Sequence, residues 1–206
     1  MFSPRTILWG GLASVFCGLF WIITWPATNG TVPIMLALVL GLVGLAGLYS
    51  WQSGQGGRLG WAGLVLGILG TGLALAAEWW LFVSGFSAPP ILIVSLGLVI
   101  LGVGIVLLGI TSLQGKALHR WRGLPLGLGL LNILGGMALW LVYYLPLSQG
   151  RDPWKLWSLI GGYVIYPAEH VLNALVVLLG LGWMGLGIML ATQANAQVVP
   201  PRPASA

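Results

Sequence analysis

The chain has 206 residues, of which 58% are hydrophobic and only 5% are charged, and its mean hydropathy is +1.00. A water-soluble domain usually carries roughly a quarter charged residues, so this composition excludes a soluble fold. The formal net charge of +5 rests on only eight Lys and Arg residues, whose positions, described below, point to lipid headgroups and not to nucleic acid.

Six apolar runs follow one another along the chain, and each is close to or above the ~20 residues that a helix needs to cross ~30 Å of hydrocarbon. They cover residues 7–25, 32–51, 60–83, 89–113, 123–147 and 167–192. Each run is apolar on every face, whereas a barrel strand would alternate over about ten residues. The sequence therefore predicts an all-α, polytopic integral membrane protein with six transmembrane helices in one domain, residues 1–195.

A repeated motif indicates that these helices form three hairpins built on one plan. Trp-x-Gly-Leu recurs near the start of the first, third and fifth runs, at Trp9, Trp61 and Trp121. The second, fourth and sixth runs end alike, at Gln52, Gln114 and Gln193. Units in the same orientation predict serial or pseudo-threefold packing about an axis along the membrane normal.

The basic residues predict the orientation of the chain in the membrane. With six spans, one side receives Arg5, Arg58, Lys116, Arg120, Arg122 and Arg202, whereas the other receives only Arg151 and Lys155. The positive-inside rule then places both termini in the cytoplasm, and we expect a multi-pass protein of the bacterial cytoplasmic (inner) membrane. The basic face is expected to meet anionic lipid headgroups.

Two segments outside the spans are also interpreted. Asp152 and Pro153 can cap and start a short helix at about 152–162, and Trp154 and Trp157 suit a segment that lies at headgroup level on the outer side. The proline-rich tail, residues 196–206, is expected to be disordered in the cytoplasm.

Glycine is abundant, with 33 residues, and in membrane helices small residues allow close backbone contact. Gly63, Gly67 and Thr71 share one face of the third run, and Gly123 and Gly127 are their counterpart on the fifth. These faces are predicted helix contacts. The same signal serves self-association, and the sequence leaves the two uses open.

Aromatic residues near the expected helix ends are interpreted as interface anchors, because an indole or phenol has an apolar body and one polar group. These anchors are Trp79, Trp80, Tyr143, Tyr144, Trp154 and Trp157.

The remaining polar residues suggest a site near the outer boundary. Glu78 shares a face with Gly70 and Ala74, so it is expected to point into the bundle. Glu169 and His170 fall in the first turn of the last run. With Asn173 one turn below, they and Glu78 would line a cup, here called the outer polar site, for a cation, a proton or a small polar ligand.

The competing interpretation is structural, because these groups are close enough to the interface to reach water or to stabilise helix ends. Asn132 lies near mid-membrane, where its amide would bond to a neighbouring helix or line a path. No paired spacing such as His-x-x-x-His predicts a metal site, and no motif predicts a cofactor.

Three functions follow from these patterns. The first is a non-catalytic scaffold or interaction subunit whose partner is a second copy or another membrane protein; it predicts tight packing with Glu78 and Glu169 facing outer water. The second is a small transporter or channel that uses the outer polar site and needs a water-accessible cavity near Asn132. The third, a membrane enzyme, would need Glu78 and His170 within about 3 to 6 Å of each other, and we do not expect catalysis.

Overall fold

A computed structural model describes residues 3–27, 31–52, 57–84, 88–114, 121, 123–144 and 165–198; at some helix ends only the backbone is described. This part of the chain is helical and contains no strand. The helices are α1 (Pro4–Ala27), α2 (Thr31–Gln52), α3 (Gly57–Ser84), α4 (Ala88–Gln114), α5 (Leu124–Leu139) and α8 (Ile165–Val198). A π-helical turn, η1 (Trp140–Tyr144), follows α5 directly.

Six helices in the described ranges are long and apolar enough to cross a membrane, which confirms the predicted all-helical, multi-pass architecture. The starts of two helices agree with the positions of proline in the sequence. Pro33 and Pro89 lie in the first turns of α2 and α4, where a missing amide hydrogen costs little. Uninterrupted helices satisfy every backbone group within the segment, which hydrocarbon requires.

Two boundaries differ from the sequence-based expectation, and one predicted element is not tested. The fifth run was expected to be one helix over 123–147, but α5 ends at Leu139 and the backbone continues with π geometry through Tyr144. The last helix reaches Val198, so the expected tail begins with helical residues. The expected interfacial segment at 152–162 lies outside the described residues.

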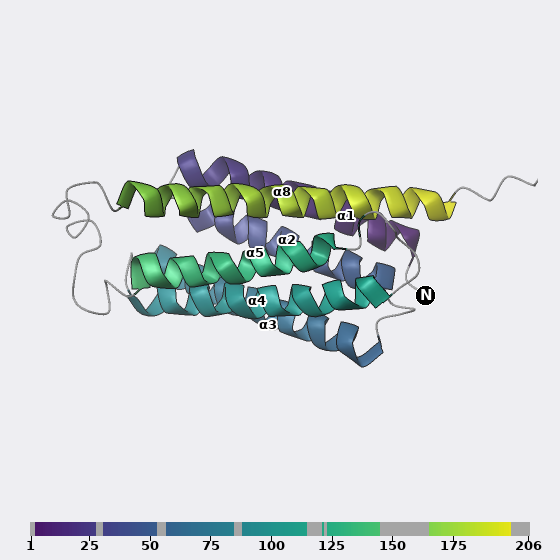
Figure 1. Ribbon diagram of the computed structural model, residues 1–206, viewed down its shortest axis with the longest axis horizontal. Helices are drawn as coiled ribbons and strands as arrows, with labels where there is room; N and C mark the ends of the chain where they lie inside the picture. The colour runs from purple at the N-terminus through teal and green to yellow at the C-terminus, as the bar shows by residue number, and fades with distance from the viewer. Residues whose placement is uncertain are drawn as a thin grey trace, which may run out of the picture.

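Contacts between neighbours close the helices into a ring in the order α1, α2, α3, α4, α5 and α8. Successive helices run antiparallel along the bundle (Figure 1). The first and last helices, α1 and α8, pack extensively on each other, and α2 also touches α4 and α8 across the ring. We call the end of the bundle that holds Pro4 and Val198 the N-terminal end, and the end that holds Ser84 and Ala88 the distal end. The ring geometry places the start of α8 at the distal end (Figure 1).

Glycines spaced seven residues apart allow the closest contacts in this ring. Gly63 and Gly70 of α3 face Gly104 and Gly97 of α4 in antiparallel register. A Cβ atom at Gly63 would lie 2.8 Å from the carbonyl oxygen of Gly104, and one at Gly97 would lie 2.7 Å from that of Gly70. A seven-residue repeat keeps one face of each helix toward its partner in a left-handed crossing.

The same spacing recurs between α1 and α8. A Cβ atom at Gly11 would lie 2.8 Å from the carbonyl oxygen of Gly187, and one at Gly180 would lie 2.7 Å from that of Gly18. Backbone atoms of one helix therefore touch backbone atoms of the next, which maximises the dispersion contacts that hold helices together in lipid.

The predicted glycine contacts are confirmed on α3 and wrong on α5. Gly63, Gly67 and Thr71 are buried, whereas Gly123 and Gly127 are exposed and a Cβ atom at either would meet nothing within 4 Å. The sequence did not reveal which of the small residues on α5 meets a neighbour. In the structure α5 turns a different face inward, and Gly129 and Gly136 of that face approach α4.

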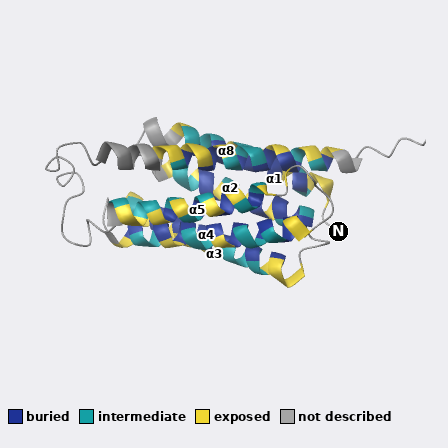
Figure 2. Cartoon of the chain, viewed as in Figure 1, coloured by how far each residue is buried: buried dark blue, intermediate teal, exposed yellow. Residues whose placement is uncertain are grey.

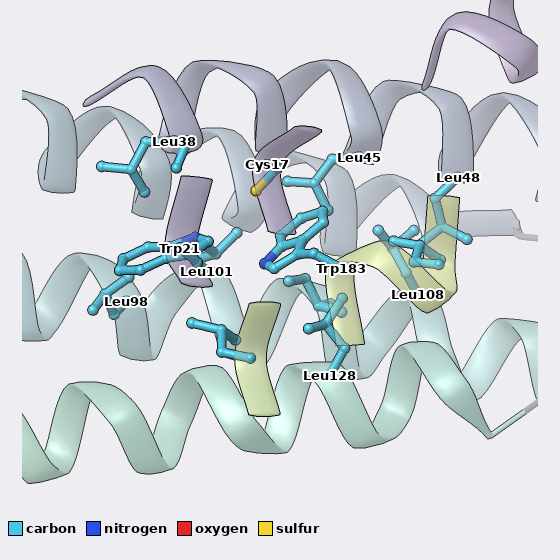
Figure 3. Close-up of a cluster of buried hydrophobic side chains, with 14 of the residues drawn as sticks. Cys17, Trp21, Leu38, Leu45, Leu48, Leu98, Leu101, Leu108, Leu128 and Trp183 are labelled. Atoms are coloured by element: carbon cyan, nitrogen blue, oxygen red, sulfur yellow. The ribbon is translucent and has the colours of Figure 1, made fainter. Parts of the chain in front are cut away.

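Large apolar side chains fill the centre of the ring. Figure 3 shows Trp183 of α8 beside Cys17, with Leu45 and Leu128 close to the indole. Trp183 is 2% exposed, and Leu45, Leu48, Ile105 and Leu108 are fully buried. We call these five residues the apolar plug: Trp183, Leu45, Leu48, Ile105 and Leu108. Large apolar side chains on the outer faces are exposed instead, as expected for faces that meet lipid (Figure 2).

Candidate functional site

Glu78 occupies the inner face of α3 near the distal end. Residues seven and eleven apart fall on nearly the same side of a helix, so Glu78 shares a stripe with Thr71 and Gly67. A Cβ atom at Gly67 would lie 2.9 Å from Leu45 of α2, which shows that this stripe faces the bundle interior. Glu78 itself is only 6% exposed, and the prediction that it points into the bundle is confirmed.

The surroundings of Glu78 are unusually poor in polar groups. Among the described residues its carboxylate makes no hydrogen bond and no ion pair. The two helices packed on α3, namely α2 (Thr31–Gln52) and α4 (Ala88–Gln114), contain no Asp, Glu, Lys, Arg or His. The scaffold hypothesis expected this side chain to face outer water, and that detail is wrong because the side chain is only 6% exposed.

The other members of the outer polar site belong to the beginning of α8. Glu169 and His170 are helical, but their side chains lie outside the described part of the structure. Asn173, one turn further along, is exposed and has an interaction partner. The convergence of these groups with Glu78 therefore stays a prediction, as does the distance between Glu78 and His170 on which the enzyme hypothesis depends.

Asn132 is buried at 1% exposure on the inner face of α5. Its Nδ2 atom donates a hydrogen bond of 2.9 Å to the carbonyl oxygen of Leu128, one turn earlier on the same helix. The expected bond to a neighbouring helix is thus replaced by a bond to its own backbone. The burial also leaves Asn132 without access to water in this conformation, whereas the transporter hypothesis required a wet cavity beside it.

A buried polar cluster at the N-terminal end was not predicted. Gln52 of α2 donates from Nε2 to the carbonyl oxygen of Leu108 at 3.0 Å and to the hydroxyl of Ser112. Its Oε1 atom accepts a hydrogen bond of 2.7 Å from the hydroxyl of Thr111. Both the Nε2 and the Oε1 atoms of the amide are hydrogen-bonded, so burying it costs little free energy. The cluster therefore fixes the position of α2 against α4.

The signal for this cluster was present in the sequence. The repeated motif marks Gln52 as the end of a helix, but it does not indicate that Gln52 bonds to the Thr111–Ser112 pair of the next hairpin. Nothing in the spacing showed that the two helix ends meet across the ring, since that contact depends on the helix order.

The predicted anchors are described only in part. Trp79 is 58% exposed and Trp80 is 45% exposed, both near the distal end of α3, which suits side chains in the headgroup region. The ring of Trp79 also stacks at a tilt on Phe82, with 5.8 Å between ring centroids. Trp154 and Trp157 lie outside the described residues, as do the side chains of Tyr143 and Tyr144 in η1.

Chemically, the described interior offers one carboxyl group at the distal end and one satisfied amide cluster at the N-terminal end, with the apolar plug between them. No group of three or more His, Cys, Asp or Glu side chains in the described ranges is arranged to hold a metal ion. Comparison of the chain with protein-family models, with curated proteins and with solved structures finds no match in any of the three.

Proposed function

We propose that this chain is a non-catalytic scaffold or interaction subunit of a membrane. The observation that carries the proposal is the apolar plug, which fills the ring centre with fully buried side chains. Interiors packed to this degree resist rearrangement, because moving one helix breaks many contacts at once. Backbone contacts through glycine at four helix interfaces, namely α1–α2, α1–α8, α3–α4 and α4–α5, add to this rigidity.

The finer architecture belongs to the same proposal. The chain is built from three repeated hairpins, with both termini in the cytoplasm, basic residues at anionic headgroups and an interfacial helix at 152–162 on the outer face of a bacterial inner membrane. Support for the repeat comes from matching contacts. Gly180 of α8 meets Gly18 of α1, and Gly102 of α4, which occupies the same position of the Leu-Gly-x-Gly motif, meets Gly129 of α5.

A scaffold needs a surface for its partner, a second copy of the chain or another membrane protein. Gly123, just before α5, and Gly127 on its outward face are exposed, and an added Cβ atom at either would meet nothing within 4 Å in the described structure. Glycine on a lipid-facing position contributes little dispersion contact to lipid but permits close approach of a partner helix.

The test is the size of the complex extracted from the native membrane in mild detergent. We expect a complex larger than one chain, and we expect Gly127→Leu to reduce its size without unfolding the bundle. Gly72→Leu is the matched control, since Gly72 is also exposed with nothing within 4 Å but lies on α3. A wild-type chain that runs as a monomer with no bound subunit contradicts the proposal.

One observation favours a second candidate, a small transporter or channel that uses the outer polar site. Glu78 is a buried carboxyl group with no partner among the described residues, and ionisable groups inside membranes commonly mark ion or proton pathways. Transport would require the plug at Trp183 to open. Purified chain in sealed liposomes should then carry a proton or Na⁺ flux that Glu78→Gln abolishes, whereas a scaffold carries none.

A further inference from the structure

Glu78 differs from every other buried polar side chain in the described ranges. Nine such side chains are buried, and eight of them make hydrogen bonds to a backbone carbonyl or to one another. These eight are Ser14, Ser50, Gln52, Thr71, Ser95, Thr111, Ser112 and Asn132. Glu78 alone among them makes none, although a carboxylate is the most costly of these groups to bury without a partner.

In the described part of the structure, the helices packed around Glu78 carry few charged or titratable groups. On α3 the only other one is Arg58, about 30 Å away along the helix. On α2 the only one is Tyr49, close to the N-terminal end, and α4 and α5 have none. Cys17 and Arg5 of α1 lie on the N-terminal side of Glu78. The η1 turn and the first turns of α8 contribute further titratable residues, whose side chains lie outside the described part of the structure: Tyr143, Tyr144, Tyr166, Glu169 and His170.

These surroundings favour one ligand over others. Ca²⁺ takes 6–8 oxygen ligands and Mg²⁺ takes six in a strict octahedron, whereas the neighbouring positions on the buried face of α3 are Ala74 and Ala77. An unpaired ionised carboxylate in such a place costs several kcal/mol, and a carboxylic acid costs far less. A proton needs no second ligand.

The route to Glu78 is also restricted. Glu78 lies six residues before the end of α3 at Ser84, which corresponds to about 9 Å along the axis. In the opposite direction the apolar plug fills the bundle, with Leu45 and Ile105 fully buried. We propose that Glu78 is a reversible proton-binding site that exchanges its proton with the compartment at the distal end.

This site goes beyond the scaffold function, since a static bundle does not need it. Proton binding gives the bundle two charge states at its distal end. The change of charge would alter the electrostatic interaction with any partner or lipid that contacts this end. Proton binding without transport is also a complete function for the site, because the plug separates it from the other compartment.

A hydrophobic carbodiimide tests the proposal, because it reacts with protonated carboxyl groups in apolar surroundings and leaves a stable acylurea that peptide mass spectrometry locates. The full chain is reconstituted in sealed vesicles, which are sorted by the side on which a C-terminal tag is accessible. We expect labelling of Glu78 at neutral pH. Raising the pH at the distal side should reduce the labelling, and raising it at the N-terminal side should leave it unchanged.

The peptide-resolved readout needs no variant, so it holds even where a substitution prevents folding. Gly72→Ala, on the exposed face of α3, serves as the control and should keep the label on Glu78. An infrared band of a protonated carboxylic acid, shifted in D₂O and lost in Glu78→Gln, is the independent measurement. Absence of both label and band at Glu78, or labelling that follows the pH of the N-terminal side, overturns the proposal. Neither result depends on whether the chain has a partner.

Discussion

The contact between α3 and α4 at Gly104 offers the sharpest test of the packing described above. A Cβ atom at Gly104 would lie 2.5 Å from the backbone nitrogen of Gly67 and 2.6 Å from the carbonyl oxygen of Gly63. Ordinary contact begins at 3.4 Å, so the two helices would have to separate by about 0.9 Å, the difference between 2.5 and 3.4 Å. No rotamer can relieve this clash, because the atoms it meets are all backbone.

The magnitude follows from two opposing effects. Overpacking of this kind typically costs about 1–3 kcal/mol, and the loss of dispersion contact along the separated helices acts in the same direction. Alanine in place of glycine in a helix returns about 0.5–1 kcal/mol through backbone entropy. We therefore expect Gly104→Ala to lower the free energy of unfolding by roughly 0.5–2 kcal/mol.

Gly72→Ala is the matched control on the outer face of α3, where an added Cβ meets nothing within 4 Å. It should be neutral or slightly stabilising, because only the entropic effect remains. The measurement is reversible unfolding in mixed micelles as the fraction of denaturing detergent rises. If Gly104→Ala proves as stable as Gly72→Ala, the helices are not in backbone contact and the packing scheme is wrong.

Three further predictions use the same assay. Trp183→Ala should destabilise the bundle by about 3–5 kcal/mol, because it opens a cavity in the apolar plug; a change below about 1 kcal/mol would mean that the centre is not closed there. The double variant Thr111→Val and Ser112→Ala should lower the free energy of unfolding more than Gln52→Leu does. It leaves the buried Oε1 atom of Gln52 without a donor and its Nε2 atom with only the Leu108 carbonyl, whereas both hydroxyls still donate to that carbonyl when Gln52 is replaced; the reverse order would refute the proposed cluster. Asn132→Leu should cost less than about 1 kcal/mol, because the bond it removes lies within one helix; a larger loss would restore a role between helices.

The spans were predictable because hydropathy over some twenty residues is a property of each segment alone. The inward direction of Glu78 was also predictable, since small residues at four-residue spacing marked its face. The rotation of α5 was not predictable in the same way. Gly123, Gly127, Gly129 and Gly136 all lie on this stretch, and only the positions of α4 and α8 determine which of them meets a neighbour.

The spacing of the glycine contacts also could not be predicted from the sequence of one helix alone. Four-residue spacing of small residues correctly marked Gly63 and Gly67 as buried, yet the glycines of α4 that meet α3, Gly97 and Gly104, are spaced by seven. A glycine-rich helix contains both spacings, so the pattern on one helix does not identify the partner. The Gln52 cluster was missed for the related reason that its two halves belong to different hairpins.

The buried polar groups at the two ends of the bundle differ in whether they have hydrogen-bond partners, and this difference is relevant to the position of a functional site. At the N-terminal end the Gln52 amide is satisfied on both sides, so it costs little and specifies how α2 meets α4. At the distal end Glu78 is enclosed without a partner in the described structure, which violates the rule that the other eight buried polar side chains obey. Leucine or glutamine at position 78 would be cheaper to bury than a carboxylate. A local departure from good packing chemistry is expected where a protein uses the group, and we therefore propose that the functional end of the molecule lies on the distal side of Trp183.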